Sequence, residues 1–335
     1  SLIWHFLADS SSFEFLLPNL VSIVTQSRLN EFREQRRVQA GSLIITFFGD
    51  VVLPRGGKIW LGSLIRLLEP LELNERLIRT SVFRLVKEEW LRTETIGRRA
   101  DYVLTPSGRR RFEEASRHIY ASHAPLWDRR WRLILVTGEL DSTVLEDVRR
   151  ALFWQGFGSL GTACFVHPSA ELSTALDVLV TAGLSSALTA LLPLFAADAC
   201  SALSASDIDL VRRAWDLGNL AEAYSTFVST YQPILDELRR EHHAGVSDQD
   251  AFLLRILLIH DYRRLLLRDP ELPDVLLPTE WPGRRAQLLC KELYKRLEPP
   301  SNRHLDQQFC IADGSTPTVD ITLAERFVQS DPLSA

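Results

Sequence analysis

The side chains best suited to chemistry in this sequence are cations and small hydroxyls spaced along one predicted helix, residues 75–89. Apolar residues recur in this stretch at intervals of three and four, which predicts an amphipathic helix with one buried face. The other positions carry Arg76, Arg79, Thr80, Ser81, Arg84 and Lys87. Arginine can pair with guanine through two hydrogen bonds, and short hydroxyl side chains can bond bases or phosphates. The residue types therefore predict contact with DNA, although a solvated basic face would explain this helix alone equally well.

A predicted β-hairpin follows this helix and supplies a second set of cations. Residues 90–96 alternate apolar and polar side chains as a strand does, and residues 101–104 return as a second strand. Gly97 permits the tight turn between them and places Arg98 and Arg99 at the hairpin tip. These two arginines are predicted to contact phosphates or the neighbouring groove.

Further helices must position the basic helix and the hairpin. Helical periodicity predicts helices over residues 20–38 and 60–68, and Thr105 begins another helix after the hairpin. Helices, a hairpin and a closing helix in this order predict a winged helix-turn-helix domain over residues 41–120. A helical extension over residues 1–40 is predicted to precede it.

The charge of the chain is unevenly distributed. The formal net charge is −5, but residues 31–117 contain about 17 Lys and Arg against about 12 Asp and Glu, so the rest of the chain is strongly acidic. A basic block on an otherwise acidic protein suits one DNA-contacting module carried by acidic sensing or dimerising domains.

The cysteine, histidine and hydropathy patterns argue against disulfide bonds, a metal site and a membrane span. The four cysteines are far apart and form no Cys-x-x-Cys pair, which favours reduced thiols; they are Cys164, Cys200, Cys290 and Cys310. The eight histidines form no pattern typical of a metal site. No apolar run reaches the roughly 18 to 20 residues that a membrane span needs, so we expect a cytoplasmic protein without a membrane partner.

The remaining two thirds of the chain predict two more domains and a tail. Residues 127–200 show a β-α-β-β-α-β order, which predicts a ferredoxin-like α+β domain. Residues 206–298 predict an all-helical domain whose last helix spans residues 284–297, and residues 299–335 form a tail. The predicted fold class is therefore α+β with several domains.

Long ordered motifs give the chain a family resemblance. The stretch GSLIITFFGDVVLPRGGKIWLGSLIRLLEPLELNERLIRTSVFRLVKEEWLRTETIGRRADYVLTPSGRRRF, residues 41–112, resembles the N-terminal domain of the PaaX family, which are repressors of phenylacetate-degradation operons. The resemblance continues through WDRRWRLILV and LFWQGFGSL and into residues 257–297. Glu89 and Ala100 replace the glycine and the serine expected in the turn after the basic helix and at the hairpin tip.

The resemblance implies a mechanism for regulation. It implies a homodimer that occupies a palindromic operator in double-stranded DNA and that needs no cofactor. It also implies that an aryl-CoA effector such as phenylacetyl-CoA releases this dimer from the DNA. An aryl-CoA needs an apolar slot for its ring and cations for its phosphates. The predicted ligand-binding residues are Tyr262, Arg263, Arg264, Arg268 and Trp281. The alternative is that these arginines pair with Asp261, Asp269 or Glu271.

Two other classes of function stay open. In the family, the central domain resembles the small CRISPR-associated endoribonuclease subunit, which uses an aspartate after its first strand, and Glu139 and Asp141 lie near that position. A nuclease or a CoA thioesterase is therefore the enzyme alternative, but the sequence has no nucleophile elbow and no metal-ligand cluster, so we predict no catalytic residues. A protein-interaction module that no longer binds DNA is the third class, and the basic residues of the helix and the hairpin argue against it.

Overall fold

The computed structural model describes residues 18–121, 125–199, 204–240, 246–320 and 326–327 of the 335-residue chain. It is an α+β structure with two small antiparallel sheets and a helical C-terminal region. The chain packs as two compact units. Unit 1 combines the chain up to residue 122 with residues 226–264 and 285–335, and unit 2 combines residues 123–225 with residues 265–284. The five segments predicted from the sequence follow chain order, whereas each unit draws on separate stretches of the chain.

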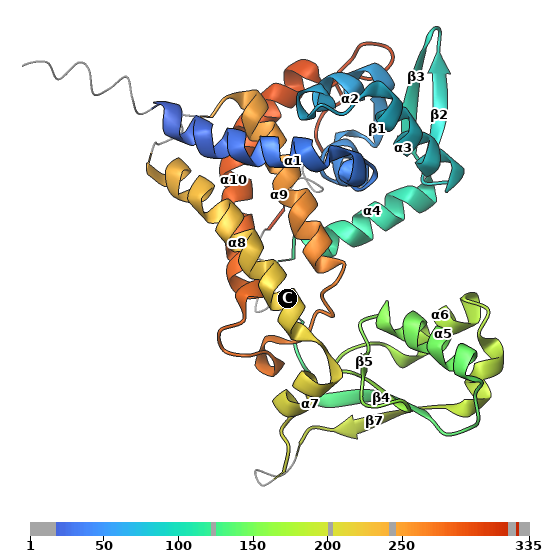
Figure 1. Cartoon of the computed structure of the whole chain (residues 1–335). Helices are drawn as coiled ribbons and strands as arrows, with labels where there is room; N and C mark the ends of the chain where they lie inside the picture. The colour runs from blue at the N-terminus through green and yellow to red at the C-terminus, as the bar shows by residue number, and fades with distance from the viewer. Residues whose placement is uncertain (1–17, 122–124, 200–203, 241–245, 321–325, 328–335) are drawn as a thin grey trace, which may run out of the picture. The chain divides into compact units, whose positions relative to one another are not determined.

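The first part of unit 1 contains the basic helix and the hairpin. Its elements are α1 (Pro18–Phe47), β1 (Lys58–Trp60), α2 (Leu61–Leu68), α3 (Glu75–Lys87), β2 (Leu91–Ile96), β3 (Arg99–Leu104) and α4 (Pro106–Ile119). The three strands form an antiparallel sheet in the order β1-β3-β2, in which Tyr102 lies opposite both Ile59 and Thr93. The β2–β3 hairpin projects beside α3 (Figure 1).

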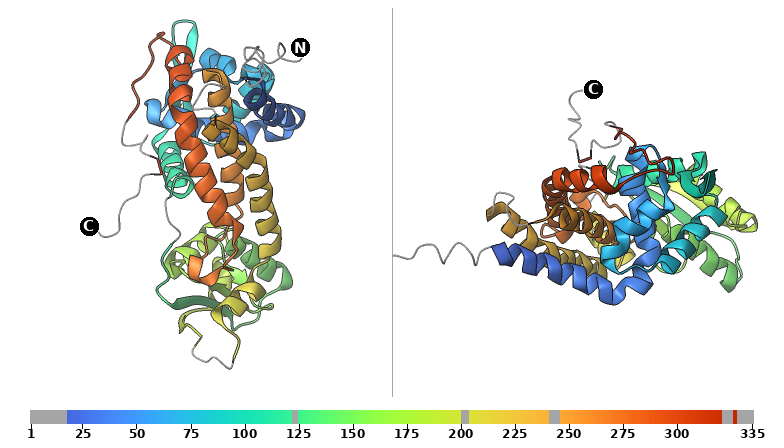
Figure 2. Two further views of the ribbon diagram at one scale, coloured as in Figure 1. Left: turned by 90° about the vertical axis from the view of Figure 1, so that its left-hand side faces the viewer. Right: turned by 90° about the horizontal axis from the view of Figure 1, so that it is seen from above.

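Three long helices complete unit 1. They are α8 (Leu217–Arg240), α9 (Asp248–Leu266) and α10 (Pro282–Gln308), and each also contributes residues to unit 2. The three helices lie side by side (Figure 2, left), and hydrogen bonds between side chains join each helix to the other two. The sequence prediction ended the last helix at Leu297, but α10 continues through Pro299 and Pro300 to Gln308.

The residues after α10 are part of the core rather than a loose tail. Phe309 and Ile311 are buried in the same apolar cluster as α1, α3 and α9. The amide of Trp60 donates to the carbonyl of Cys310 over 3.2 Å, and the amide of Ala312 donates to Oδ1 of Asp101 over 2.7 Å. The segment therefore binds the backbone of β1 and a side chain of β3.

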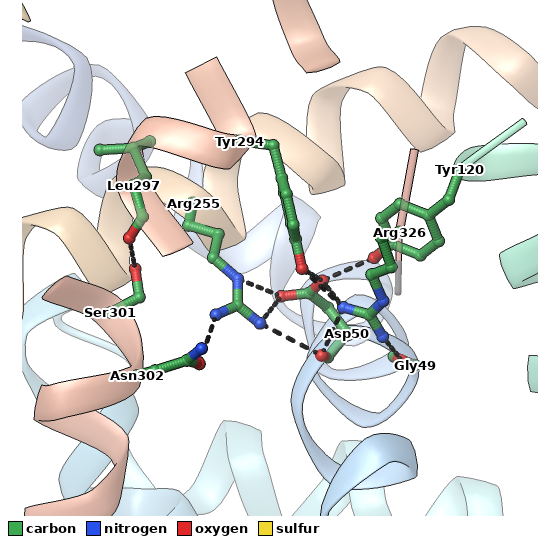
Figure 3. Close-up of polar contacts among 9 residues, drawn as sticks. All are labelled: Gly49, Asp50, Tyr120, Arg255, Tyr294, Leu297, Ser301, Asn302 and Arg326. Carbon is green, nitrogen blue, oxygen red and sulfur yellow. Dashed lines mark hydrogen bonds and ion pairs between the residues drawn. The ribbon is translucent and has the colours of Figure 1, made fainter. Parts of the chain in front are cut away.

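A buried ionic cluster ties distant parts of unit 1 together. Asp50 lies in the π-helical turn after α1 (Phe48–Val52) and forms ion pairs with Arg255 of α9 and Arg326 near the C-terminus (Figure 3). The hydroxyls of Tyr120 and Tyr294 also donate to its carboxylate, over 2.5 Å and 3.1 Å. Burial by itself would raise the pKa of Asp50, but the two guanidinium groups outweigh it, and the pKa lies below its ordinary value.

Unit 2 is built on the second sheet. Its elements are β4 (Arg130–Val136), α5 (Ser142–Phe153), β5 (Gly158–Ser159), β6 (Cys164–His167), α6 (Leu172–Thr181), β7 (Leu191–Ala197) and α7 (Asp207–Ala214). The strands are antiparallel in the order β5-β6-β4-β7. Ile134 and Phe165 pack with α5 and α6 in one buried cluster, whereas Trp131 and Val166 pack with α7 in another.

The cysteines that the structure describes carry free thiols, namely Cys164, Cys290 and Cys310. Cys200 lies outside the described residues.

Candidate nucleic-acid interface

The start of α3 is fixed by a cap and by an arginine of α1. The side chain of Asn74 accepts a hydrogen bond from the amide of Leu77 over 2.8 Å, so Asn74 caps the helix. The guanidinium of Arg33 donates twice to the carbonyl of Pro70, over 3.0 Å and 2.8 Å. Ile78 and Val82 bury the opposite face of the helix in the core of unit 1. The helix is therefore anchored at its beginning and along its length.

The exposed face of α3 carries five of the six predicted DNA-contacting residues. The exposed residues of α3 are Glu75, Phe83 and five of the predicted set, namely Arg76, Arg79, Thr80, Arg84 and Lys87. Ser81 is only half-buried, and its hydroxyl donates to the carbonyl of Leu77 over 2.9 Å. The hydroxyl of Thr80 donates in the same way to the carbonyl of Arg76, over 2.8 Å. The structure thus places the four cations on one exposed surface and turns Ser81 to its edge.

The four cations of this surface differ in their partners. Arg79 forms an ion pair with Glu75 at 2.6 Å and Arg84 forms one with Glu88 at 2.7 Å, each one turn apart on the helix. Exposed pairs of this kind contribute little to stability, so a phosphate or a base can replace the glutamate at small cost. Among the described residues, Arg76 and Lys87 have no acidic partner.

The hairpin tip presents one arginine outward and holds the other against the sheet. Gly97 has a φ of +60°, which the turn requires, and Arg98 follows it as an exposed residue. The guanidinium of Arg99 lies over the ring of Trp60, 4.5 Å from its centroid, and donates to the carbonyl of Ala312 over 3.5 Å. Arg98 is therefore the better placed of the two for a phosphate contact.

The turn between α3 and β2 is strained at a residue that the sequence marked as unusual. Glu89 adopts a φ of +60°, the left-handed region in which glycine is favoured. Its carbonyl accepts hydrogen bonds from the hydroxyls of Thr105 and Ser107, over 2.6 Å and 3.1 Å. These bonds join the turn to the start of α4 and hold Glu89 in this conformation.

The predicted effector residues are divided between the two units. Tyr262, Arg263 and Arg264 belong to unit 1, whereas Arg268 and Trp281 belong to unit 2. The structure therefore does not assemble these five residues within one compact unit.

Two of these residues have structural roles in unit 1. Tyr262 is buried against Phe227, with 5.7 Å between the ring centroids. Arg263 is half-buried and donates to the hydroxyls of Ser42 and Thr46, over 2.6 Å and 3.2 Å. Burial, with the nearby charge of Arg264, lowers the pKa of Arg263 to about 10.

The acids that were alternative partners for these arginines have other contacts. Asp261 pairs with Arg28 of α1 at 2.5 Å and also accepts a hydrogen bond from Tyr231. Asp269 accepts a hydrogen bond from Tyr224 over 2.5 Å. Tyr224 also contacts Trp281, with 5.9 Å between the ring centroids, and Arg264 and Arg268 are exposed.

The residues of the enzyme alternative lie at the surface of unit 2. Glu139 and Asp141 are exposed in the loop before α5, where Asp141 is the cap residue without a capping hydrogen bond. In the described ranges, no group of three or more His, Cys, Asp or Glu is placed to hold a metal ion. None of the described helices is long and apolar enough to cross a membrane.

Two family models match separate parts of the chain and together cover about half of it. Residues 39–108 match the family model described as PaaX-like protein, and residues 215–307 match the PaaX-like protein C-terminal domain. The first match contains the whole of α3 and the hairpin, and the second contains most of the three long helices. Both models describe PaaX-like proteins.

A curated relative gives the same family over the length of the chain. The chain is 38% identical over 293 residues to the transcriptional repressor PaaX of Escherichia coli (strain K12), covering 87% of this chain and 90% of that protein. The chain therefore belongs to the PaaX family. A solved structure of an uncharacterized protein from Mycobacterium tuberculosis is also similar, with a TM-score of 0.45 and 21% identity over 71% of this chain and 90% of that one.

Proposed function

We propose that this chain is a DNA-binding transcriptional repressor of phenylacetate catabolic genes. Its membership of the PaaX family carries the proposal. The exposed face of α3 supports it, because four cations and a hydroxyl lie together on a helix whose other face is fixed in the core. Family membership favours a regulator over the nuclease and thioesterase alternatives.

We infer that α2, α3 and the β2–β3 hairpin act as a winged helix-turn-helix. Two successive helices, a hairpin beside the second of them and a third strand closing the sheet support this inference. In this arrangement α3 enters the major groove, and Arg98 at the hairpin tip contacts the backbone beside it. Unit 2 has the β-α-β-β-α-β order and the strand order β5-β6-β4-β7 that a ferredoxin-like domain requires, and we assign it a scaffold role.

The proposal includes an effector and a dimer. Two copies bind a palindromic operator with their α3 helices about one helical turn apart, or a multiple of that distance. An aryl-CoA such as phenylacetyl-CoA releases the DNA if it binds more tightly to a geometry in which the two helices no longer match the half-sites. Arg264 of unit 1 is exposed and available for a phosphate of the ligand, whereas Arg263 is engaged by Ser42 and Thr46.

A mobility-shift titration tests this proposal. The full chain is titrated against DNA from upstream of its own gene, without ligand, with phenylacetyl-CoA, and with free phenylacetate as the control. We expect a retarded complex that phenylacetyl-CoA dissociates and phenylacetate leaves intact. A complex that no aryl-CoA alters would remove the effector, and the absence of any specific complex would remove the repressor assignment.

A further inference from the structure

Phe83 is the residue of α3 that a cation-based account leaves unexplained. Its side chain is 69% exposed, the largest exposed fraction of any large apolar side chain among the described residues of unit 1. It lies outside the stripe of Ile78, Val82 and Leu85 that anchors the helix. Within the described part of the chain, no aromatic ring and no guanidinium stacks on it.

The exposed neighbours of Phe83 on the helix surface are cations and a hydroxyl. Positions three and four residues away share a face of a helix, so Arg79, Thr80 and Lys87 lie beside the ring, and Val86, also beside it, is half-buried against the core. Arg76 continues the same face one turn earlier. Aromatic residues and arginine are enriched at protein interfaces but charged residues as a group are depleted at their core, so four cations on the same face as the ring favour an anionic partner. The ring suits a polyanion that also presents an apolar group.

The major groove of DNA offers such a group. The C5 methyl of thymine is the apolar contact that the base edges present there, and phenylalanine is one of the side chains that pack against it. The phosphates on either side of the groove complement the surrounding cations. We propose that Phe83 is a specificity-determining residue that packs against thymine methyl groups in the operator, while the cations around it hold the backbone or read guanine.

The inference rests on the proposed DNA-binding function and deepens it, because it names the base chemistry that α3 reads. It predicts that the operator half-site contains a thymine whose methyl group contributes to binding. Loss of one buried methyl corresponds to about a fourfold loss of affinity. Truncation of the ring should cost roughly tenfold or more, because it also removes the apolar area that covers the base step.

A substitution cycle on both molecules tests the inference. Thymines of the footprinted operator are replaced one at a time by deoxyuridine, which removes only the C5 methyl, and affinity is measured by fluorescence anisotropy. The wild-type chain and Phe83→Ala are compared, with Leu288→Ala as the matched control. Leu288 is an apolar residue of α10 whose side chain is 59% exposed. Thermal unfolding of each variant verifies that the fold is retained.

The expected result is coupling at one or more positions. Deoxyuridine should weaken binding by wild type and by Leu288→Ala about fourfold. At the same position it should leave the affinity of Phe83→Ala for the operator unchanged. Equal sensitivity to deoxyuridine in Phe83→Ala and wild type would overturn the inference while leaving the repressor assignment intact. So would unchanged deoxyuridine sensitivity together with a loss of dimer in sedimentation, because Phe83 would then contact a second copy. A wild-type chain that binds no operator would overturn the function and the inference together.

Discussion

At the scale of single residues, the cations of α3 and of the hairpin tip have different surroundings, and different roles follow. Arg84 lies on the exposed face of α3, where a phosphate or a base can replace its ion-pair partner Glu88. Arg98 lies at the turn of the hairpin. A cation on a helix in the groove can reach base edges, whereas a cation on a wing is expected to contact phosphates. The two arginines therefore form a matched pair of positions for substitution.

Arg84→Ala and Arg98→Ala should weaken binding in different ways. Arg84→Ala should reduce operator affinity roughly 5- to 150-fold and relax the preference for the operator over unrelated DNA. Arg98→Ala should weaken binding to all sequences alike and reduce the slope of log affinity against log salt by about one. Salt titrations with operator and scrambled DNA measure both effects. A uniform loss from Arg84→Ala with unchanged specificity would contradict its role in base reading.

Glu89 offers a prediction about stability at the same scale. Glu89→Gly should raise the free energy of unfolding by about 1 kcal/mol, because glycine tolerates the φ of +60° that a larger residue adopts at a cost. Urea unfolding of the two chains measures the difference. Glu89→Ala is the control, since alanine retains the Cβ atom and should bring no gain. A destabilised Glu89→Gly chain would mean that the turn needs the stiffness of the glutamate.

At the scale of elements, the periodicity of the sequence predicted α3, the hairpin and α4 within a few residues. The predicted α3 ended at Glu89 and the observed helix ends at Lys87, and the Thr105 cap of α4 is present. Apolar spacing and caps are local signals, so local rules suffice there. The prediction for this helix assigned no role to Phe83, whose position lies off the buried stripe.

The end of α10 could not be predicted from local signals. Two adjacent prolines usually end a helix, but Leu305 and the following Phe309 are buried in the core of unit 1, and this packing carries the helix past Pro299 and Pro300. The contacts that decide it are made with α1, α3 and α9, far away in the sequence. The same reason explains why the segment after α10 was predicted to be a tail.

Phe309 should contribute as much to the stability of the fold as other buried residues of the core of unit 1. Phe309→Ala should lower the free energy of unfolding by about 3–5 kcal/mol, since the ring is 1% exposed and its removal leaves a cavity in the core of unit 1. Ser315→Ala, in the exposed turn beyond it, is the control and should change stability little. Chemical denaturation measures both. A Phe309→Ala chain as stable as wild type would show that the segment is not part of the core.

At the scale of the whole molecule, the Asp50 cluster gives unit 1 a pH-dependent stability. The pKa of Asp50 is lower in the folded chain than in the unfolded chain, so its stabilisation is full above about pH 4 and is lost as the pH falls through the folded value. Asp50→Asn should lose about 3–5 kcal/mol at neutral pH, because Arg255 and Arg326 stay buried without their counter-ion. Unfolding free energies measured between pH 3 and pH 7 should converge for the two chains toward low pH. Parallel curves would contradict this role for Asp50.

The effector residues predicted from the sequence are divided between the two units, a division that local sequence patterns do not record. Cations and aromatics close in sequence between Tyr262 and Trp281 belong to different units, and Arg263 is engaged by α1. A sequence pattern records neighbours along a chain, whereas a ligand site depends on neighbours in space. The predicted DNA-contacting residues lie on one helix and one hairpin, so a pattern along the chain could place them together.

The most direct test of the account is the ratio of affinities for operator and unrelated DNA. The full chain is titrated against a duplex from upstream of its own gene and against a scrambled duplex of equal length, at one physiological salt concentration. A repressor that reads bases through α3 should bind the first duplex at least about a thousandfold more tightly. Equal affinity for the two duplexes would contradict sequence-specific repression by this chain.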